Sequence, residues 1–440
     1  MNQPAGQNSE LRDSDQYVTR TPLRKVWKRS MSMAHGRTQA ERLRQETRGK
    51  PILHKAKEYL KIQVLQWVWH YVRSRFGRKW PFADYAPYED DNGIYPLTAK
   101  PEDPDSAGPV RISLLGDWGS GTQEALDVAE RVKEDSPDFT IHLGDIYYVG
   151  TKKEVRENML GGRVLWPIGS RGSFALNANH EMYARGKAYF KYLLPVMGLR
   201  DRNGGRLPGQ RASFFCLKNA HWLVIGLDTG YYSVGAPIFE KIFKPSAKLH
   251  SKLIKWLTDD VGLPDDRQRG IVLLSHHQYY SQFESGYERS ARQLARLVDR
   301  PVLWFWGHEH RFAIYGKHAT KKGRLQVHGR CVGHGGLPIE DIVDKPKRRR
   351  KNQVGLVLYD RRERTRISKA RVSVGYNGYA NLQFEARTLT VEYKDTEQAL
   401  VREVWEVDNS GILKGISIKR LVDHEDLVLH DGANPGQAIA

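Results

Sequence analysis

The sequence predicts an α/β fold in which two mixed β-sheets pack face to face with helices on the outside. Two observations lead to this expectation. Between residues 110 and 306, short apolar runs typical of buried strands alternate with stretches of helical character. After residue 325 the runs are strand-like, and turns separate them. Strands that alternate first with helices and then with turns fit this arrangement of layers.

The expected elements follow in order. A helix is predicted over residues 123–133, where the apolar residues recur at helical spacing. The strands expected around it are Val110–Leu115, Phe139–Leu143, Phe174–Leu176, Trp222–Leu227, Ile271–Leu274 and Val302–Trp306. The later strand-like runs are Leu325–His328, Val354–Tyr359, Ala380–Phe384, Leu389–Tyr393 and Leu400–Trp405.

Composition divides the chain into four parts. Residues 1–82 form a basic arm that leads into a Trp-rich helix, and residues 83–109 form a linker rich in Pro, Asp and Tyr. The predicted α/β domain covers residues 110–424, and residues 425–440 read as a polar tail. With 40% hydrophobic residues and 11 Trp, the chain has enough apolar side chains for a large core.

The remaining composition suits an intracellular protein. Cys216 and Cys331 are the only cysteines, too few for a disulfide framework. The stretch after Met1 is polar and lacks the apolar core of a signal peptide. No apolar run approaches the roughly 20 residues that span a bilayer. We therefore expect a cytoplasmic location, with membrane association as an addition that the basic N-terminus could supply.

The net charge of +19 is concentrated at the N-terminus. Residues 1–82 hold 18 Lys and Arg against 6 Asp and Glu, a net charge of +12, which leaves +7 for the rest of the chain. Residues 1–50 contain few aliphatic side chains and are expected to be disordered or loosely helical. A second basic cluster, KPKRRRK at residues 345–351, is most simply a solvated loop.

Residues 54–76 mix Trp, Tyr and aliphatic side chains with Lys and Arg, and two interpretations stay open for the predicted helix. It could pack on the α/β domain as a strap, with its basic side chains reaching outward. It could also lie on an anionic membrane surface, or serve with the arm to bind another polyanion. No recognised DNA- or RNA-binding motif accompanies the basic arm.

Metal-binding residue types follow five of the predicted strands. Asp117 and Asp145 each come after a Gly at a strand end, and Asn179-His180 follows the third strand. His276-His277 and the pair His308 and His310 end two later strands. Because the carboxyl ends of parallel strands carry the ligand sites of α/β sheets, these side chains are expected to meet.

This set of ligands favours a site for two metal ions. Carboxylates, a carboxamide and imidazoles together suit Zn, Mn or Fe rather than Ca. Two carboxylates and three histidines exceed what one tetrahedral ion needs. The surplus indicates two ions about 3.5–4 Å apart that share a carboxylate.

The same motifs resemble the calcineurin-like metallophosphoesterases, most closely the purple acid phosphatase branch. The pattern of that family is GD-x-G, GD-x-x-Y, GNH-[ED], V-x-x-H and GH-x-H. Here the motifs read GDWG at 116–119, GDIYY at 144–148, ANHE at 178–181, LLSH at 273–276 and GHEH at 307–310. The resemblance covers roughly residues 110 to 400, and it implies the two-sheet sandwich already expected from the strand order.

The resemblance also implies a role for each motif residue. It assigns Asp117, Tyr148 and His310 to the first metal, Asn179, His276 and His308 to the second, and Asp145 to a bridge between them. His180 would protonate the leaving oxygen. The phenolate of Tyr148, three residues after the bridging Asp, implies Fe(III) paired with a divalent Fe, Mn or Zn.

Three positions depart from the family pattern. Ala178 stands where the family has Gly, and Leu273 stands where it has Val. No His lies between His277 and His308, where phosphomonoesterases of this branch carry a second substrate-facing His. His277 could face the substrate or only hold an orienting hydrogen bond. His328 and His334 remain unassigned candidates for the pocket.

We therefore expect a dinuclear-metal hydrolase that cleaves phosphate monoesters or diesters, using metal-bound hydroxide and His180 as general acid. The alternative is a non-catalytic scaffold, or a polyanion- or membrane-binding protein, built on the same fold.

Overall fold

The structure is a computed structural model, and it describes residues 78–439 with gaps. The gaps are 148, 162–164, 202–206, 235–245, 321–323, 338, 340–354, 368–371 and 430–434. Residues 1–77 of the predicted arm and Trp-rich helix, the basic cluster at 345–351 and Tyr148 therefore lie outside the described residues. Within the described part, no helix is long and apolar enough to cross a membrane.

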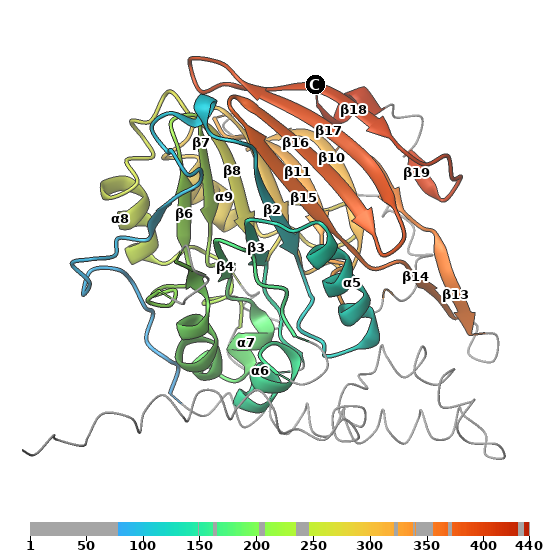
Figure 1. Ribbon diagram of the computed structural model, residues 1–440, viewed down its shortest axis with the longest axis horizontal. Coiled ribbons are helices and arrows are strands. Elements are labelled where there is room, and N and C mark those ends of the chain that lie inside the picture. The colour runs from blue at the N-terminus through green and yellow to red at the C-terminus, as the bar shows by residue number, and fades with distance from the viewer. Residues whose placement is uncertain are drawn as a thin grey trace, which may run out of the picture.

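The predicted fold class is confirmed, because the domain contains two large mixed sheets with helices outside them (Figure 1). In spatial order, the eight-stranded sheet consists of β18 (Leu413–Arg420), β17 (Ala399–Val407), β16 (Thr388–Asp395), β15 (Gly378–Glu385), β2 (Val110–Leu115), β3 (Phe139–His142), β4 (Gly172–Ala175) and β5 (Gly198–Leu199). β2, β3 and β4 run parallel, and the other neighbours are antiparallel.

The nine-stranded sheet has a longer parallel centre. In spatial order it consists of β1 (Ile94–Pro96), β6 (Phe215–Lys218), β7 (Trp222–Gly226), β8 (Gly270–Ser275), β9 (Pro301–Trp306), β11 (Gln326–Val332), β10 (Phe312–Ala319), β12 (Leu356–Asp360) and β19 (Leu427–Leu429). β7, β8, β9 and β11 are parallel. A separate hairpin joins β13 (Glu363–Ile367) and β14 (Val372–Gly375).

Helices cover the outer faces of both sheets. The α-helices are α5 (Gln123–Glu134), α6 (Lys152–Asn158), α7 (Asn179–Tyr183), α8 (Ser251–Asp259) and α9 (Glu288–Leu294). Short helical turns lie at Pro104–Ser106, Tyr189–Leu193, Leu194–Val196 and Pro435–Ala438. α5 begins where the Thr122 side chain accepts a hydrogen bond from the Ala125 N–H, and Arg131 and Lys133 lie in its last turn. Both features favour a helix with these bounds.

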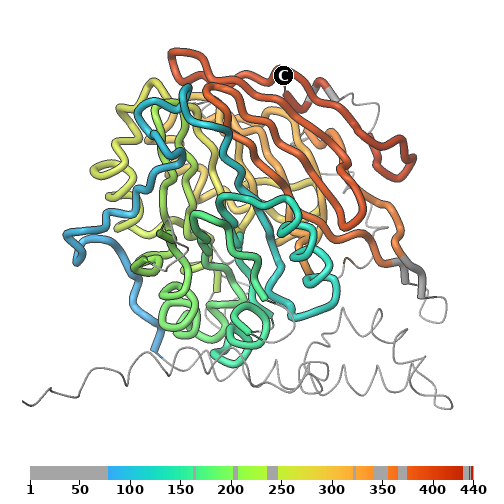
Figure 2. The backbone as a smooth tube through the Cα atoms, in the orientation of Figure 1, coloured from blue at the N-terminus to red at the C-terminus, as the bar shows by residue number. Residues whose placement is uncertain are grey.

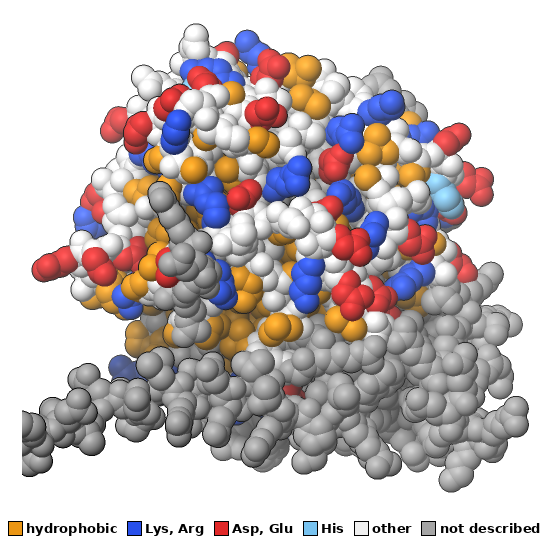
Figure 3. Space-filling model, viewed as in Figure 1, with side chains coloured by type: hydrophobic (Ala, Val, Ile, Leu, Met, Phe, Trp, Pro, Cys, Tyr) orange, Lys and Arg blue, Asp and Glu red, His pale blue; other side chains and the backbone are white. Residues whose placement is uncertain are grey.

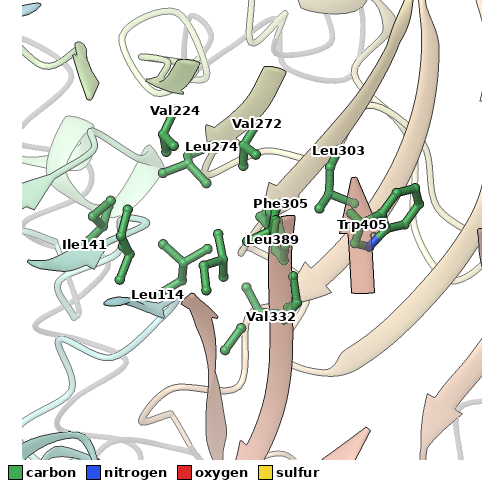
Figure 4. Packing of buried hydrophobic residues seen from close by; sticks show 14 of the residues in the cluster. Leu114, Ile141, Val224, Val272, Leu274, Leu303, Phe305, Val332, Leu389 and Trp405 are labelled. Carbon is green, nitrogen blue, oxygen red and sulfur yellow. The ribbon is translucent and has the colours of Figure 1, made fainter. Parts of the chain in front are cut away.

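The alternation of side chains along the strands produces three apolar layers. On β9, Leu303 and Phe305 point into the core between the sheets, whereas Trp304 and Trp306 point outward under α8 and α9. This is the period-two pattern of a strand that is buried on both faces. The labelled side chains in Figure 4 converge from both sheets: Leu114, Ile141, Leu389, Trp405, Val224, Val272, Leu274, Leu303, Phe305 and Val332.

The segment predicted as a linker, residues 83–109, packs along the domain. β1 pairs in parallel with β6, and Tyr85 and Leu97 are buried in the apolar cores. Just before it, the ring of Phe82 stacks on the ring of His250 at 4.0 Å. Figure 2 shows this segment in blue at the edge of the molecule. The aromatic side chains of a Pro- and Asp-rich stretch thus supply the contacts that hold it in place.

The segment predicted as a polar tail also makes contacts with the core. β19 forms an edge of the nine-stranded sheet, and Ala438 is buried. The backbone carbonyl of Ala438 accepts hydrogen bonds from the side chains of His328 and Arg330. Acidic and basic side chains are interspersed on the face of the domain seen in Figure 3.

A buried ion pair joins the two sheets. Arg330 on β11 and Glu403 on β17 are both inaccessible to solvent, and the Arg330 Nε lies 3.0 Å from one carboxylate oxygen of Glu403. The guanidinium also donates to the Tyr315 carbonyl, and the Trp405 indole donates to Glu403. Each charged group therefore has several partners, as a buried charge requires.

We predict that Arg330→Met will lower the free energy of unfolding by about 3–5 kcal/mol, because it leaves the Glu403 carboxylate buried without its counter-charge. The double variant Arg330→Met/Glu403→Gln should lose clearly less. Urea denaturation of the three proteins measures the difference. A single variant as stable as the double variant would contradict this role for the pair.

We predict that deletion of residues 1–50 will leave a folded, soluble protein, whereas deletion of residues 1–82 will cause aggregation. The longer deletion removes Phe82, which is only 7% exposed and packs on Phe214 and His250. Loss of such a side chain costs about 2 kcal/mol and uncovers apolar surface. Size-exclusion chromatography compares the two proteins. If the longer deletion stays monomeric and loses only binding to anionic liposomes, the membrane interpretation of the helix is favoured.

Candidate metal centre

The side chains predicted to bind metal come together at one end of the two sheets. They follow the carboxyl ends of β2, β3, β4, β8 and β9, whose ends lie at a common edge. Two groups of three side chains each present ligand atoms within 4.8 Å of one another: Asp117, Asp145 and His310, and His276, His277 and His308. Six of the predicted site residues are therefore neighbours in space.

The first group is built around carboxylates. His310 Nε2 lies 3.5 Å from Asp117 Oδ1. The hydroxyl of Tyr147 donates to Asp117 Oδ1 at 2.8 Å and lies 3.0 Å from His310 Nε2. It also lies 3.3 Å from Asp145 Oδ2. A phenol oxygen therefore does stand beside the two carboxylates, but it comes from Tyr147, and the predicted Tyr148 lies outside the described residues.

The second group is built around imidazoles. His276 Nε2 lies 3.1 Å from Asn179 Oδ1 and 3.2 Å from His308 Nδ1. The same nitrogen lies 3.3 Å from Asp145 Oδ2. Asp145 therefore touches atoms of both groups, which is the position that a bridging carboxylate would need.

These donor atoms fit a bound cation. His276 Nδ1 donates to the carbonyl of Leu143 at 3.1 Å, which leaves Nε2 with its lone pair directed toward the other ligand atoms. Oxygen and nitrogen lone pairs of Asn179, Asp145 and His308 crowd the same point. Such a cluster of acceptors is what Zn, Mn or Fe takes up.

The pKa values of the centre reflect burial and the close carboxylates. Burial disfavours the charged form of His276, but Asp145 and Asp117 outweigh this effect and raise its pKa to about 9. Burial and the neighbouring His276 lower the pKa of His308 to about 3. Burial and the two carboxylates hold the pKa of Tyr147 well above its usual value. The carboxylates therefore favour the protonated form of His276, and the phenol of Tyr147 donates a hydrogen bond to Asp117.

The backbone of the centre is unusual at the ligands themselves. Asp117, Asp145 and His308 have φ values of 59°, 73° and 67°, in the left-handed region that non-glycine residues rarely adopt. Gly144, with φ of 107°, precedes one of them, and a Cβ there would lie 2.6 Å from the Cβ of Ala178. The sharp turn after β3 therefore requires glycine at this position.

Aromatic rings enclose the centre. The His180 ring lies 4.5 Å from the ring of Tyr147 and 4.9 Å from that of Tyr183. The ring of Tyr287 lies 4.8 Å from His277 and 5.9 Å from His308. His328 and His334 belong to neither ligand group, and both are buried away from solvent.

The residues after β7 also support the centre, and the sequence analysis did not identify them. After β7, Asp228 accepts a hydrogen bond from Asn177 Nδ2 at 3.1 Å. The next residue, Thr229, accepts the backbone N–H of His277 at 3.0 Å, and its oxygen lies 3.1 Å from His277 Nδ1. Asp228-Thr229-Gly230 follows the predicted strand Trp222–Leu227, so the strand-end rule that found the ligands could have found these residues too.

A family model described as calcineurin-like phosphoesterase matches residues 110–312, which include all five motifs. This segment is a calcineurin-like phosphoesterase domain. The family uses two metal ions to hydrolyse phosphoesters, and the two ligand groups are consistent with that requirement. No curated protein matches the chain.

Solved structures similar to this phosphoesterase have little sequence in common with it. GAP50, titled as the anchor in the inner membrane complex of Plasmodium, is 13% identical, with 75% of this chain and 92% of that chain covered and a TM-score of 0.43. A structure of PhoD is 10% identical, with 74% and 73% covered and a TM-score of 0.40. A predicted phosphoesterase from Streptococcus pneumoniae is 11% identical, with 70% and 98% covered and a TM-score of 0.24. Similarity at this level does not indicate a substrate.

We predict that the full chain, loaded with Mn or Zn and desalted, will retain two ions and that Asp145→Asn will retain fewer. Asp145 belongs to the first group of ligand atoms and its Oδ2 lies 3.3 Å from His276 Nε2 of the second, so its loss should weaken the binding of both ions. Bound metal should also raise the thermal unfolding midpoint, since a ligand at about 100 times its Kd adds about 2.7 kcal/mol of stability.

Asp105→Asn is the matched control, because Asp105 is an exposed carboxylate that pairs with His221 and precedes β2, whereas the proposed ligand Asp117 follows the other end of that strand. Elemental analysis gives the metal content of each protein. Two ions held with unchanged affinity by Asp145→Asn would exclude Asp145 as the bridge.

Proposed function

We propose that the phosphoesterase domain hydrolyses phosphate monoesters or diesters with two metal ions, using His180 as the proton donor. One observation carries the proposal: Asp145 belongs to the first group of ligand atoms and lies 3.3 Å from His276 of the second, and His180 Nε2 lies 3.7 Å from Asp145 Oδ2. The proposed ligands are Asp117, Asp145, His310 and a tyrosine for one ion, and Asn179, His276, His308 and Asp145 for the other. When bound, the ions lower the pKa of a water molecule and offset charge on the phosphoryl oxygens.

His180 has the surroundings that a proton donor needs. Its backbone N–H donates to Asp145 Oδ1 at 3.1 Å, which fixes the residue next to the proposed bridge. Its side chain is 17% exposed while that of Asp145 is 2% exposed, so a substrate can reach the imidazole. Transfer of a proton to the leaving oxygen contributes about 10²–10⁴ in rate.

His277 is proposed as a contact for the substrate rather than as a metal ligand. The Thr229 hydroxyl can accept the backbone N–H of His277 and donate to its Nδ1 at the same time. That arrangement places the ring proton on Nε2, where it can be donated to a phosphoryl oxygen. It also removes the lone pair that a metal ion would need on Nε2. His277 would then do what the second histidine does in the related monoesterases.

We predict that His180→Ala will slow hydrolysis by about 10²–10⁴ while two metal ions stay bound. The loss should be larger for phenyl phosphate than for p-nitrophenyl phosphate, because the poorer leaving group depends more on the proton. The same comparison with bis(p-nitrophenyl) phosphate separates monoester from diester activity. His424→Ala, an exposed histidine at the far end of the chain, is the control.

An equal loss for both leaving groups would argue against proton donation by His180. Fewer than two bound ions together with no turnover of any ester in the parent protein would favour the non-catalytic scaffold. Both outcomes come from the same set of measurements.

We further propose Fe(III) at the first site, with a tyrosine phenolate as its ligand and a divalent Fe, Mn or Zn as the partner ion. The hydroxyl of Tyr147 stands 2.8 Å from Asp117 Oδ1, which supports this residue as the ligand. The resemblance to purple acid phosphatases points instead to Tyr148. Either phenolate on Fe(III) would give the protein a visible charge-transfer colour.

We predict that the iron-loaded protein will be coloured and that Tyr147→Phe will abolish the visible band, whereas Tyr148→Phe will keep it. The two variants differ by one position and remove the same hydroxyl, so each is a control for the other. Loss of colour only in Tyr148→Phe would transfer the ligand role to that residue. A colourless, fully active protein without iron would rule out the purple acid phosphatase branch.

A further inference from the structure

A hollow lies at the opposite end of the nine-stranded sheet from the metal centre. It has a volume of about 500 Å³ and is lined by the loop after α8, by the residues after α9 and by Arg324 just before β11. β9 begins next to this hollow and ends at the metal ligands, and a strand of six residues spans roughly 20 Å. The hollow is therefore separate from the phosphoesterase site.

Three guanidinium groups line the hollow, from Arg267, Arg296 and Arg324, against the single carboxylate of Asp299. Asp299 is already paired with Arg267. Within the described part of the chain, Arg296 and Arg324 have no carboxylate partner. The hollow thus holds a surplus of two positive charges, which repel each other until an anion comes between them.

The walls that carry these groups are well anchored. Arg300, next to Asp299, is buried, and its guanidinium donates to the carbonyls of Asp266 and Arg269 in the loop after α8. Within that loop, Arg269 forms an ion pair with Asp266 at 2.8 Å. The loop and the start of β9 are thus tied together, so the hollow does not depend on loose surface segments.

Apolar side chains line the hollow beside the arginines: Pro264, Ala295, Leu297 and Val298. A volume of about 500 Å³ is typical of sites for small molecules, which combine apolar walls with a few charged groups. Guanidinium groups bind phosphate and sulfonate oxygens in pairs of parallel hydrogen bonds. The ligand class that fits is a small organic molecule with at least two oxyanion groups for the exposed guanidinium groups and a small apolar part for the side chains beside them.

We propose that this hollow, formed by Arg267, Arg296 and Arg324 over an apolar wall, is a binding site for a small organic polyanion, distinct from the metal centre. The site needs neither metal nor catalysis, so it does not depend on the proposed hydrolase function. Nucleoside polyphosphates and other phosphorylated metabolites share the required chemistry.

The test uses pyrenetetrasulfonate, a fluorescent polyanion with an apolar body, and the full metal-loaded chain. Fluorescence anisotropy should show saturable binding that Arg296→Ala/Arg324→Ala weakens by about tenfold or more. Arg289→Ala/Arg292→Ala removes the same charge from α9 without touching the hollow and should change the affinity less than twofold. Exposed arginines are expected to be replaceable with little effect on folding.

A second variant separates shape from charge. Ala295→Phe fills the hollow and leaves the net charge unchanged, so it should weaken binding about as strongly as the arginine double variant. Equal affinity in the two arginine double variants, or undiminished binding by Ala295→Phe, would overturn the proposal and assign the binding to the basic surface in general. Displacement of the probe by adenosine diphosphate but not by adenosine would identify phosphate oxygens as the recognised groups.

Discussion

The carboxylate of Asp117 holds the two sheets together at the metal centre. Its Oδ2 accepts the backbone N–H of His308 at 2.8 Å, which connects the end of β2 in one sheet to the end of β9 in the other. Its Oδ1 accepts the hydroxyl of Tyr147 from the end of β3. The two loops can approach this closely only because Gly307 lacks a side chain, since a Cβ there would lie 2.7 Å from Asp117 Oδ2.

Much of this arrangement follows from local patterns in the sequence. Continuous apolar runs predicted the central strands, because strands covered on both faces contain few polar residues. Asp or His directly after such a run then predicted candidate ligands, and the structure brings six of these side chains to one edge. The sequence did not give the pairing of β10 with β11 or the order of the strands within each sheet. Both depend on contacts between distant segments.

The residues that the sequence did not reveal are polar side chains whose partners lie on other elements of the fold. The hydroxyl of Tyr147 contacts both carboxylates, and the spacing of the motif gave no reason to expect this residue at the centre. Thr229 contacts His277 from 48 positions away. The buried pair of Arg330 and Glu403 is 73 positions apart and lies inside an otherwise apolar core. A periodic pattern identifies which face of a strand is buried, but it does not identify the partner of a buried polar group.

The left-handed backbone of the three metal ligands has a consequence for engineering. Each of Asp117, Asp145 and His308 holds a conformation that costs roughly 1 kcal/mol for a residue with a side chain. Glycine adopts the same conformation at almost no cost. A screen that selects for heat resistance of the metal-free protein would therefore favour glycine at His308, whose contact with Asp117 is made by its backbone N–H, and would remove a proposed metal ligand. Selection for thermostability in this domain has to be carried out with the metals present.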